Sequence, residues 1–330
     1  MGAMSRSEKI LDHLYRIPVP LPGNPLRELN AYLILGGQRA VLIDTGFHQD
    51  ACRDALWAGL AEHGLKPGDV EILLTHLHSD HSGMAPETAG EKPIYISHTD
   101  LPSLADMDCR FELRKKSDFR YRAEGFPQAI LDGVEQNNPA RSLAPPVGGN
   151  YQGLENGQVL DVGGYKLKCL FMPGHTPGQM CFWEEKEGLL FTGDHVLFDI
   201  TPNITAWNGV EDSLGTYLES LKRIREVDHR LALPGHRGTG DLKARVDHLI
   251  EHHQQRLEEA LQAVAGHPGA GAYELAGYMT WRIRARSWED FPVAQKWFAV
   301  GECMSHLDYL RLRGAIRREV DGGLHRYYKN

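Results

Sequence analysis

The segment Thr75–Gly83 places three histidines and an aspartate within six consecutive positions, at His76, His78, Asp80 and His81. It directly follows the apolar run 70–74, which predicts a buried strand. Side-chain packing does not require imidazoles and a carboxylate at the end of a strand. Neutral imidazole, in contrast, is the commonest protein ligand for zinc and related ions. The segment therefore predicts a metal site at a sheet edge.

Three later positions repeat this arrangement. His175, Asp194 and His236 each follow shortly after a short apolar run, and each is marked by a neighbouring glycine. Four strand ends that all carry ligand-type residues predict a binuclear metal centre along one edge of a sheet.

These motifs resemble those of the metallo-β-lactamase superfamily over roughly the first 240 residues. The resemblance implies three ligands for one metal ion, namely His76, His78 and His175. It implies three for the second ion, namely Asp80, His81 and His236. Asp194 would bridge the two ions, and Asp44, at the end of another apolar run, would orient a ligand.

The fold that the resemblance implies is α/β, an αββα sandwich with the metals at one edge between two facing sheets. The residues themselves predict strands and helices in alternation. The expected strands cover 14–19, 31–35, 40–44 and 93–96, and the expected helices cover 50–63, 210–228 and 241–264. Residues 1–240 would form this hydrolase domain.

The ligand set bears on the metal and on the chemistry. Seven His and Asp ligands without cysteine suit two zinc ions, and iron or manganese are compatible. Such ions would lower the pKa of a bridging water toward neutrality and give a hydroxide nucleophile. Asp80 is the candidate to steer the proton, because it can stay ionised beside the cations. The family's diiron redox branch usually has Glu where this chain has His78, so redox chemistry is disfavoured.

The substrate class that we predict is a small ester or thioester, as in the hydroxyacylglutathione hydrolases of this family. Phosphodiester or RNA hydrolysis, as in the lactamase-like endoribonucleases, and lactone hydrolysis are alternatives. Residues 1–240 hold 23 Lys and Arg against 32 Asp and Glu, which disfavours nucleic acid as the substrate. A further alternative is a DNA-binding regulator in which the metals act as a sensor.

Bulk properties restrict location and partners. The formal net charge is −8, no apolar run reaches 18 residues, and the five cysteines are scattered. We therefore expect a cytoplasmic protein with reduced thiols, a small-molecule substrate and no membrane segment.

Residues 99–158 interrupt the strand pattern with a long insert that holds basic side chains among aromatic ones. Because long structureless loops are uncommon, we expect a lid or substrate wall over the metals, with a surface excursion packed on the sandwich as the alternative. Asn203 and Trp207, on the loop after Asp194, are candidate pocket residues, and the alternative there is a packed connector.

Residues 241–330 look like a winged-helix domain, as in one branch of the family. Helices over 273–280 and 293–312 precede a predicted hairpin at 315–328. The basic excess over 281–330 is small, ten Lys and Arg against six Asp and Glu. We therefore expect this part to pack on the hydrolase domain or on a second subunit, with nucleic-acid binding as the alternative. His195 is expected to point away from the metals, and His252 and His253 are expected to face solvent.

Overall fold

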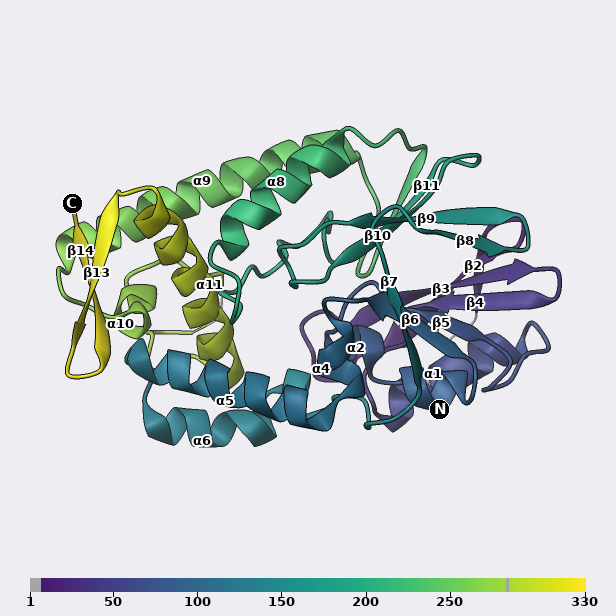
Figure 1. Cartoon of the computed structure of the whole chain (residues 1–330), viewed down its shortest axis with the longest axis horizontal. Coiled ribbons are helices and arrows are strands. Elements are labelled where there is room, and N and C mark those ends of the chain that lie inside the picture. The colour runs from purple at the N-terminus through teal and green to yellow at the C-terminus, as the bar shows by residue number, and fades with distance from the viewer. Residues whose placement is uncertain (1–6, 283–284) are drawn as a thin grey trace.

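The structure is a computed structural model that describes residues 7–282 and 285–330. Within them, the strands form two mixed sheets and a separate hairpin (Figure 1). The first sheet contains, in spatial order, β1 (Glu8–Leu11), β2 (Leu14–Pro20), β3 (Glu28–Gly36), β4 (Arg39–Ile43), β5 (Glu71–Leu73), β6 (Pro93–Ser97) and β7 (Asn150–Leu154). The second contains β12 (Leu231–Pro234), β11 (Leu189–Gly193), β10 (Met180–Glu184), β9 (Tyr165–Phe171) and β8 (Val159–Val162). Strands β4 to β7 run parallel to one another, as do β11 and β12.

Helices cover the outer face of each sheet. On the first sheet lie α1 (Asp50–Ala61), α3 (Ala85–Ala89) and α4 (Leu101–Ala105), whereas α2 (Ser79–Ser82) lies beyond the end of β5. On the second lie α8 (Ser213–Arg225) and α9 (Leu242–Gly266). One apolar core separates the two sheets, and a further core lies between each sheet and its helices. The layers are therefore helices, sheet, sheet and helices.

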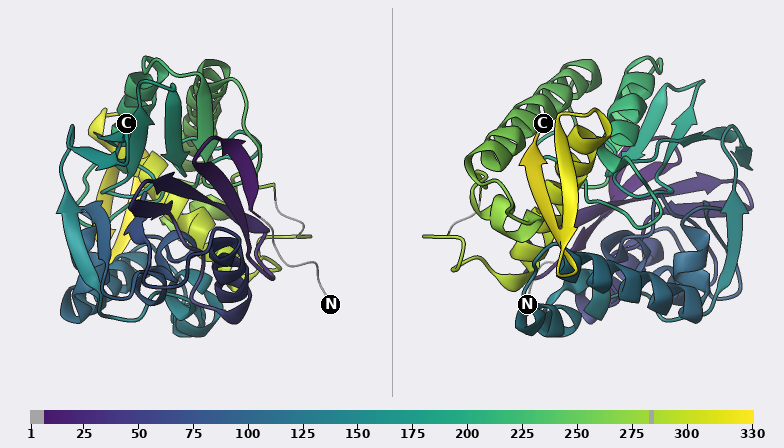
Figure 2. Two further views of the ribbon diagram at one scale, coloured as in Figure 1. Left: turned by 90° about the vertical axis from the view of Figure 1, so that its right-hand side faces the viewer. Right: turned by 60° about the vertical axis from the view of Figure 1, so that its left-hand side comes forward.

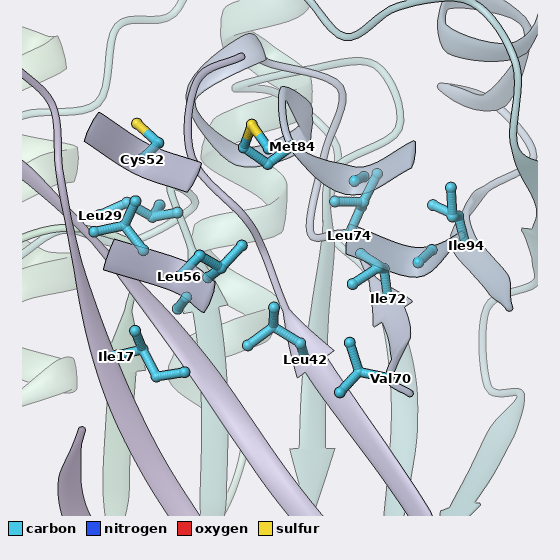
Figure 3. Packing of buried hydrophobic residues seen from close by; sticks show 14 of the residues in the cluster. Ile17, Leu29, Leu42, Cys52, Leu56, Val70, Ile72, Leu74, Met84 and Ile94 are labelled. Atoms are coloured by element: carbon cyan, nitrogen blue, oxygen red, sulfur yellow. The ribbon is translucent and has the colours of Figure 1, made fainter. Parts of the chain in front are cut away.

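The packing of α1 illustrates how the sequence produces these layers. Cys52, Leu56 and Leu60 recur at every fourth position, so they share one face of the helix, and all three are fully buried. Figure 3 shows Cys52 and Leu56 in this core. Burial of each leucine stabilises the fold by about 1.5–3 kcal/mol. On the same face, a Cβ at Gly59 would lie 2.6 Å from Ile17 Cγ2, so glycine allows the helix to approach β2.

The insert and the C-terminal part share one core. The insert forms α5 (Met107–Ala123), α6 (Gln128–Asn137) and α7 (Pro139–Ser142), and the C-terminal part forms α10 (Ala272–Gly277), α11 (Val293–Leu312), β13 (Ile316–Asp321) and β14 (Leu324–Lys329). Figure 2 shows the C-terminal hairpin beside helices of the insert. Tyr121 and Phe126 of the insert pack with Val300, Leu307 and Tyr327. These insert aromatics therefore pack on the C-terminal helices rather than on the sandwich.

Two expectations need correction. The stretch 99–158 is not wholly an insert, because Asn150–Leu154 forms β7 and pairs with β6 at the edge of the first sheet. His253 does not face solvent; it is fully buried, and its Nδ1 lies 3.2 Å from Nε2 of His306, because α11 covers that face of α9. His252 is half-buried.

The order of helices and hairpin after residue 241 is as expected, but winged-helix identity stays a prediction. In the part of the chain that the structure describes, no helix is both long and apolar enough to cross a bilayer.

Candidate metal centre

The ligand-type side chains lie where strands of both sheets end. His76 and His78 lie in the loop after β5, and Asp80 and His81 lie in the helix α2 that follows it. The loop between β9 and β10 carries His175, and β11 and β12 end just before Asp194 and His236. Their potential ligand atoms form two groups, each within 4.8 Å, which are His76, His78 and His175, and Asp80, His81, Asp194 and His236. The two groups are consistent with a binuclear metal site.

A glycine permits the approach of β12 to this edge. A Cβ at Gly235 would lie 2.6 Å from Asp194 Oδ1 and 2.7 Å from His81 Cε1. The same turn is anchored to the first sheet, because the Asn30 backbone N–H donates to the Gly235 carbonyl over 2.7 Å and its side-chain amide donates to Pro234 over 2.9 Å. The strand end is thus fixed between the two sheets.

The first group consists of three converging imidazoles. His78 Nδ1 lies 3.1 Å from His76 Nε2 and 3.0 Å from His175 Nε2. Nitrogen lone pairs that face one another at this distance repel unless a proton or a cation lies between them. The group therefore has the donor set and the arrangement of a three-histidine metal site.

The second group adds two carboxylates. Asp80 Oδ2 lies 3.2 Å from His236 Nε2, and Asp194 Oδ1 lies 3.4 Å from His81 Nε2. The other oxygen of Asp194 lies 3.5 Å from His236 Nε2 and 3.7 Å from His175 Nε2, which belongs to the first group. Asp194 therefore contacts both groups, as a bridging ligand would.

Hydrogen bonds outside the groups fix which nitrogen faces inward in three of the rings. Nδ1 of His81 donates to Asp44 over 2.8 Å, Nδ1 of His175 donates to the Asn203 carbonyl over 2.9 Å, and Nδ1 of His236 donates to a backbone carbonyl over 2.7 Å. Because Nδ1 donates outward in these three rings, Nε2 is the nitrogen that faces the centre.

Asp44 orients two ligands at once. Its Oδ2 accepts from His81 Nδ1 and, over 2.8 Å, from the hydroxyl of Thr75. Having given its proton to Asp44, that hydroxyl accepts from His76 Nδ1 over 2.9 Å. Asp44 has φ 62°, a left-handed conformation that is uncommon outside glycine and recurs at functional sites.

Burial keeps the rings of the first group neutral. Loss of solvent lowers the pKa of His76 well below its ordinary value and that of His78 to about 3, and it also lowers the pKa of His175. Neutral imidazole is the form that binds metal, so this group is ready for a cation without first losing protons.

The second group behaves in the opposite way. Burial would lower the pKa of His81 and His236, but the carboxylates, chiefly that of Asp194, outweigh it and raise both. The same histidines overcome burial at the carboxylates, so the pKa of Asp80 falls to about 2 and that of Asp194 falls further. The carboxylates are therefore ionised at neutral pH and attract a cation.

The residues present fit a bound metal. Among the described residues, His81 Nε2, His236 Nε2 and Asp194 Oδ1 are buried polar atoms without a hydrogen-bond partner, and all three face the second group. A buried polar atom without a partner costs about 1–3 kcal/mol, and coordination to a cation would remove that cost. His195 lies outside both groups, against Tyr217, with ring centroids 5.3 Å apart.

Asp100 is a functional candidate that the sequence interpretation missed. It is 1% exposed, and its Oδ2 accepts from the backbone N–H of Leu77 over 3.1 Å and from the Thr176 hydroxyl over 2.8 Å. Leu77 stands between His76 and His78, and Thr176 follows His175. Asp100 therefore joins the two loops that supply the first group, although no local motif marks it.

Both candidate pocket residues border the first group. Trp207 stacks on His78, with ring centroids 5.8 Å apart, and its Nε1 donates to the His175 carbonyl over 3.0 Å. Asn203 supports His175 through its backbone carbonyl, and its side-chain amide donates to Glu302 of α11 over 3.1 Å. Trp207 thus forms a wall of the centre, and Asn203 acts as a support.

Comparison with known proteins agrees with this fold and site. Residues 25–236 match the model of the Metallo-beta-lactamase superfamily, so the chain belongs to that superfamily. It has that fold and a candidate His/Asp metal site.

Individual relatives are similar over most of the chain. The lactamase-like protein adaB of Aspergillus niger is 31% identical over 263 residues, which are 78% of this chain but 65% of adaB. The atrochrysone carboxyl ACP thioesterase of Aspergillus fumigatus is 29% identical over 280 residues, 80% of this chain and 71% of that protein. The alignment with adaB spans less than two thirds of that relative.

Solved structures extend the likeness to the whole chain. A metallo-beta-lactamase family protein from Thermus thermophilus is 32% identical with a TM-score of 0.83, covering 98% of this chain and 100% of that one. A beta-lactamase domain protein from Burkholderia ambifaria has the same fold, with a TM-score of 0.79 at 24% identity, covering 100% of this chain and 95% of that one.

Proposed function

We propose that this protein hydrolyses a small acyl thioester or ester at a binuclear metal centre. The observation that carries the proposal is the position of Asp194, whose two oxygens face both ligand groups. When bound, two such metal ions would supply Lewis acidity and lower the pKa of water toward neutrality. Zinc suits the donor set best, and iron or manganese are compatible.

The protein's own residues would hold the ions, orient the reactants and move a proton. The ring orientations fixed by Asp44 and Asn203 direct the Nε2 atoms inward. Asp80, ionised and 9% exposed, can accept a proton at the rim of the second group. Trp207 offers an apolar face beside His78 and excludes water from that side.

A relative supports the thioester in particular, since one similar protein bears the name atrochrysone carboxyl ACP thioesterase, at 29% identity. The acidic balance of residues 1–240 argues against a polyanionic substrate entering the site. Lactone and phosphodiester hydrolysis remain the alternatives within the enzyme class. A DNA-binding regulator of winged-helix type is the alternative outside it.

For residues 241–330 we propose a structural role in the enzyme rather than sequence reading in DNA. Glu302 of α11 holds Asn203, which supports a ligand, and the shared core ties α11 to the insert. A contact with a second copy of the chain is a further proposal for this part.

Competing substrates test the proposal directly. Protein stripped by chelator and reloaded with Zn²⁺, Mn²⁺ or Fe²⁺ is given S-butyryl-N-acetylcysteamine, γ-butyrolactone and bis(p-nitrophenyl) phosphate in parallel. We expect the thioester to have the highest kcat/KM, with turnover lost on chelation and in His76→Ala. A higher kcat/KM for the lactone or the phosphodiester would replace the proposed substrate class. Duplex DNA binding without any turnover would favour the regulator.

A further inference from the structure

A cavity of about 620 Å³ lies between α5 and the loop that carries Trp207. Its wall is formed by Lys115, Lys116, Phe119, Arg120 and Arg122 of α5, and by Asn208 and Gly209 of the loop. Cavities of this size are typical of small-molecule sites. The seven ligands of the metal centre are not part of its wall.

The wall is cationic although the protein is acidic. Four basic side chains line the cavity and no carboxylate does, while the whole chain has a formal net charge of −8. Lys115 is paired with Glu112 and Arg120 with Asp308. Lys116 and Arg122 have no ion-pair partner within the described residues. An anion entering the cavity would therefore meet unneutralised positive charge.

An exposed aromatic ring accompanies these charges. Phe119 is 72% exposed, which is costly for an apolar side chain that has no partner. Basic groups beside a free aromatic face are the combination that binds nucleotides, because phosphates pair with the cations and a base stacks on the ring.

One residue, Trp207, contacts both the cavity wall and the metal centre. Asn208 and Gly209 line the cavity, and the carbonyl of the preceding Trp207 accepts a hydrogen bond from Arg120 over 3.4 Å. The indole of the same Trp207 stacks on His78. The extended pantetheine arm, with its two amides, is as long as several residues of extended chain at about 3.5 Å each. It is therefore long enough to pass one residue, Trp207.

We propose that the cavity binds the phosphorylated nucleotide half of a coenzyme A-type thioester, while the pantetheine arm passes Trp207 and presents the thioester to the metals. This inference rests on the proposed thioesterase function and names the substrate class. The cations Lys116 and Arg122, unpaired among the described residues, lie beside the exposed ring of Phe119 and with it match the phosphates and the base of a nucleotide bisphosphate. The carrier protein is therefore an outcome of the test rather than the proposal.

Three thioesters that share one acyl group separate the contribution of the nucleotide from those of the phosphate and the pantetheine arm. Thiol release is measured from butyryl-coenzyme A, S-butyryl-4′-phosphopantetheine and S-butyryl-pantetheine, with wild type, Lys115→Ala/Lys116→Ala and Lys222→Ala. Lys222 is a matched control, because it pairs with a glutamate three residues earlier, as Lys115 does, but on α8. We expect the double variant to lose about tenfold in kcat/KM for butyryl-coenzyme A through KM. Its kcat/KM for S-butyryl-pantetheine should not change.

Binding of adenosine 3′,5′-bisphosphate, followed by calorimetry, tests the cavity independently of turnover. The wild type and Lys222→Ala should bind it, and the double variant should bind it about tenfold more weakly. If this ligand binds as expected while no thioester is hydrolysed, the proposed function fails and the cavity assignment stands.

Other results would overturn the assignment. One is equal kcat/KM for butyryl-coenzyme A and S-butyryl-pantetheine in the wild type together with no bisphosphate binding. Another is a higher KM of the double variant for a butyryl thioester of a carrier protein, together with an unchanged KM for butyryl-coenzyme A. That result would make this face a protein-docking surface.

Discussion

Glu302 accepts a hydrogen bond from the side-chain amide of Asn203 over 3.1 Å, which ties helix α11 to the metal centre. The backbone carbonyl of Asn203 in turn accepts from Nδ1 of His175 over 2.9 Å. The loop is held at a further point, because the Ser305 hydroxyl donates to the Ile204 carbonyl over 2.6 Å. The orientation of one predicted ligand therefore depends on a helix near the end of the chain.

Replacing Glu302 with Ala should weaken metal binding by the His175 group about tenfold, because the supporting carbonyl of Asn203 loses its anchor. Glu302→Gln keeps an acceptor oxygen and should retain most of the affinity. The measurement is chelator competition for Co²⁺, followed by its absorption spectrum. Glu319→Ala, at an exposed position of β13, is the control. Unchanged Co²⁺ affinity in Glu302→Ala would mean that α11 does not position His175.

Asp194→Ala should reduce the metal content from close to two equivalents to less than one. The carboxylate faces both groups, so its loss weakens both sites, whereas His78→Ala should affect the first group more than the second. Elemental analysis of protein purified without chelator gives the stoichiometry. A wild type that holds no transition metal even after supplementation would contradict the binuclear assignment.

Asp80→Ala should lower turnover by on the order of 10²-fold or more, since it removes both a ligand and the proton-steering carboxylate. Steady-state kinetics on the best thioester substrate measure the loss, and circular dichroism checks that the fold is kept. Asp54→Ala, at an exposed position of α1, should behave like wild type. Near-wild-type turnover of Asp80→Ala would show that the role is misassigned.

Asp100 should make the stability of metal-free protein fall as the pH rises. Burial raises the pKa of Asp100 to about 6, against hydrogen bonds from Thr176 and Leu77 that lower it. The pKa of Asp100 in the folded protein lies above its unfolded value of 3.8. The contribution of protonated Asp100 to the free energy of unfolding is therefore complete below about pH 4 and is lost as the pH rises past about 6. The loss is on the order of 3 kcal/mol.

Asp100→Asn cannot ionise, so its free energy of unfolding should match that of wild type near pH 4 and exceed it above pH 7. Urea unfolding of chelator-treated protein between these pH values measures the difference, with Asp54→Asn as the control. Parallel curves for wild type and Asp100→Asn would show that this carboxyl group does not titrate in that window.

The sequence predicts the ligand set because the signal is local. Each ligand follows a strand whose apolar residues are contiguous, and parallel strands bring their carboxyl ends to one edge. Nothing local marks Asp100 or Glu302, since each acts on a loop far away in the chain. Their roles depend on tertiary packing between distant segments, and the local sequence around each residue does not reveal that packing.

The missed elements have similar causes. The strand Asn150–Leu154 has mostly exposed or half-buried side chains, so it lacks the apolar run that identifies a buried strand. From sequence alone, the polar character of His253 and the length of its helix predict an exposed side chain. Its burial follows from α11 covering α9, a contact that helical periodicity does not specify. The two aromatics Tyr121 and Phe126 indicate an insert with a core but not which segment completes it.

The shared core of the insert and the C-terminal part sets an order for folding during synthesis. The Tyr121 hydroxyl donates to the Trp297 carbonyl over 3.0 Å, and the two rings stack, although the residues are 176 positions apart. At roughly 5–20 residues per second, the ribosome delivers Trp297 roughly 9–35 s after Tyr121. The nascent insert therefore stays without its complete core while these 176 residues are synthesised. The sandwich can form first, and the loop that supports His175 is fixed last, when α11 emerges.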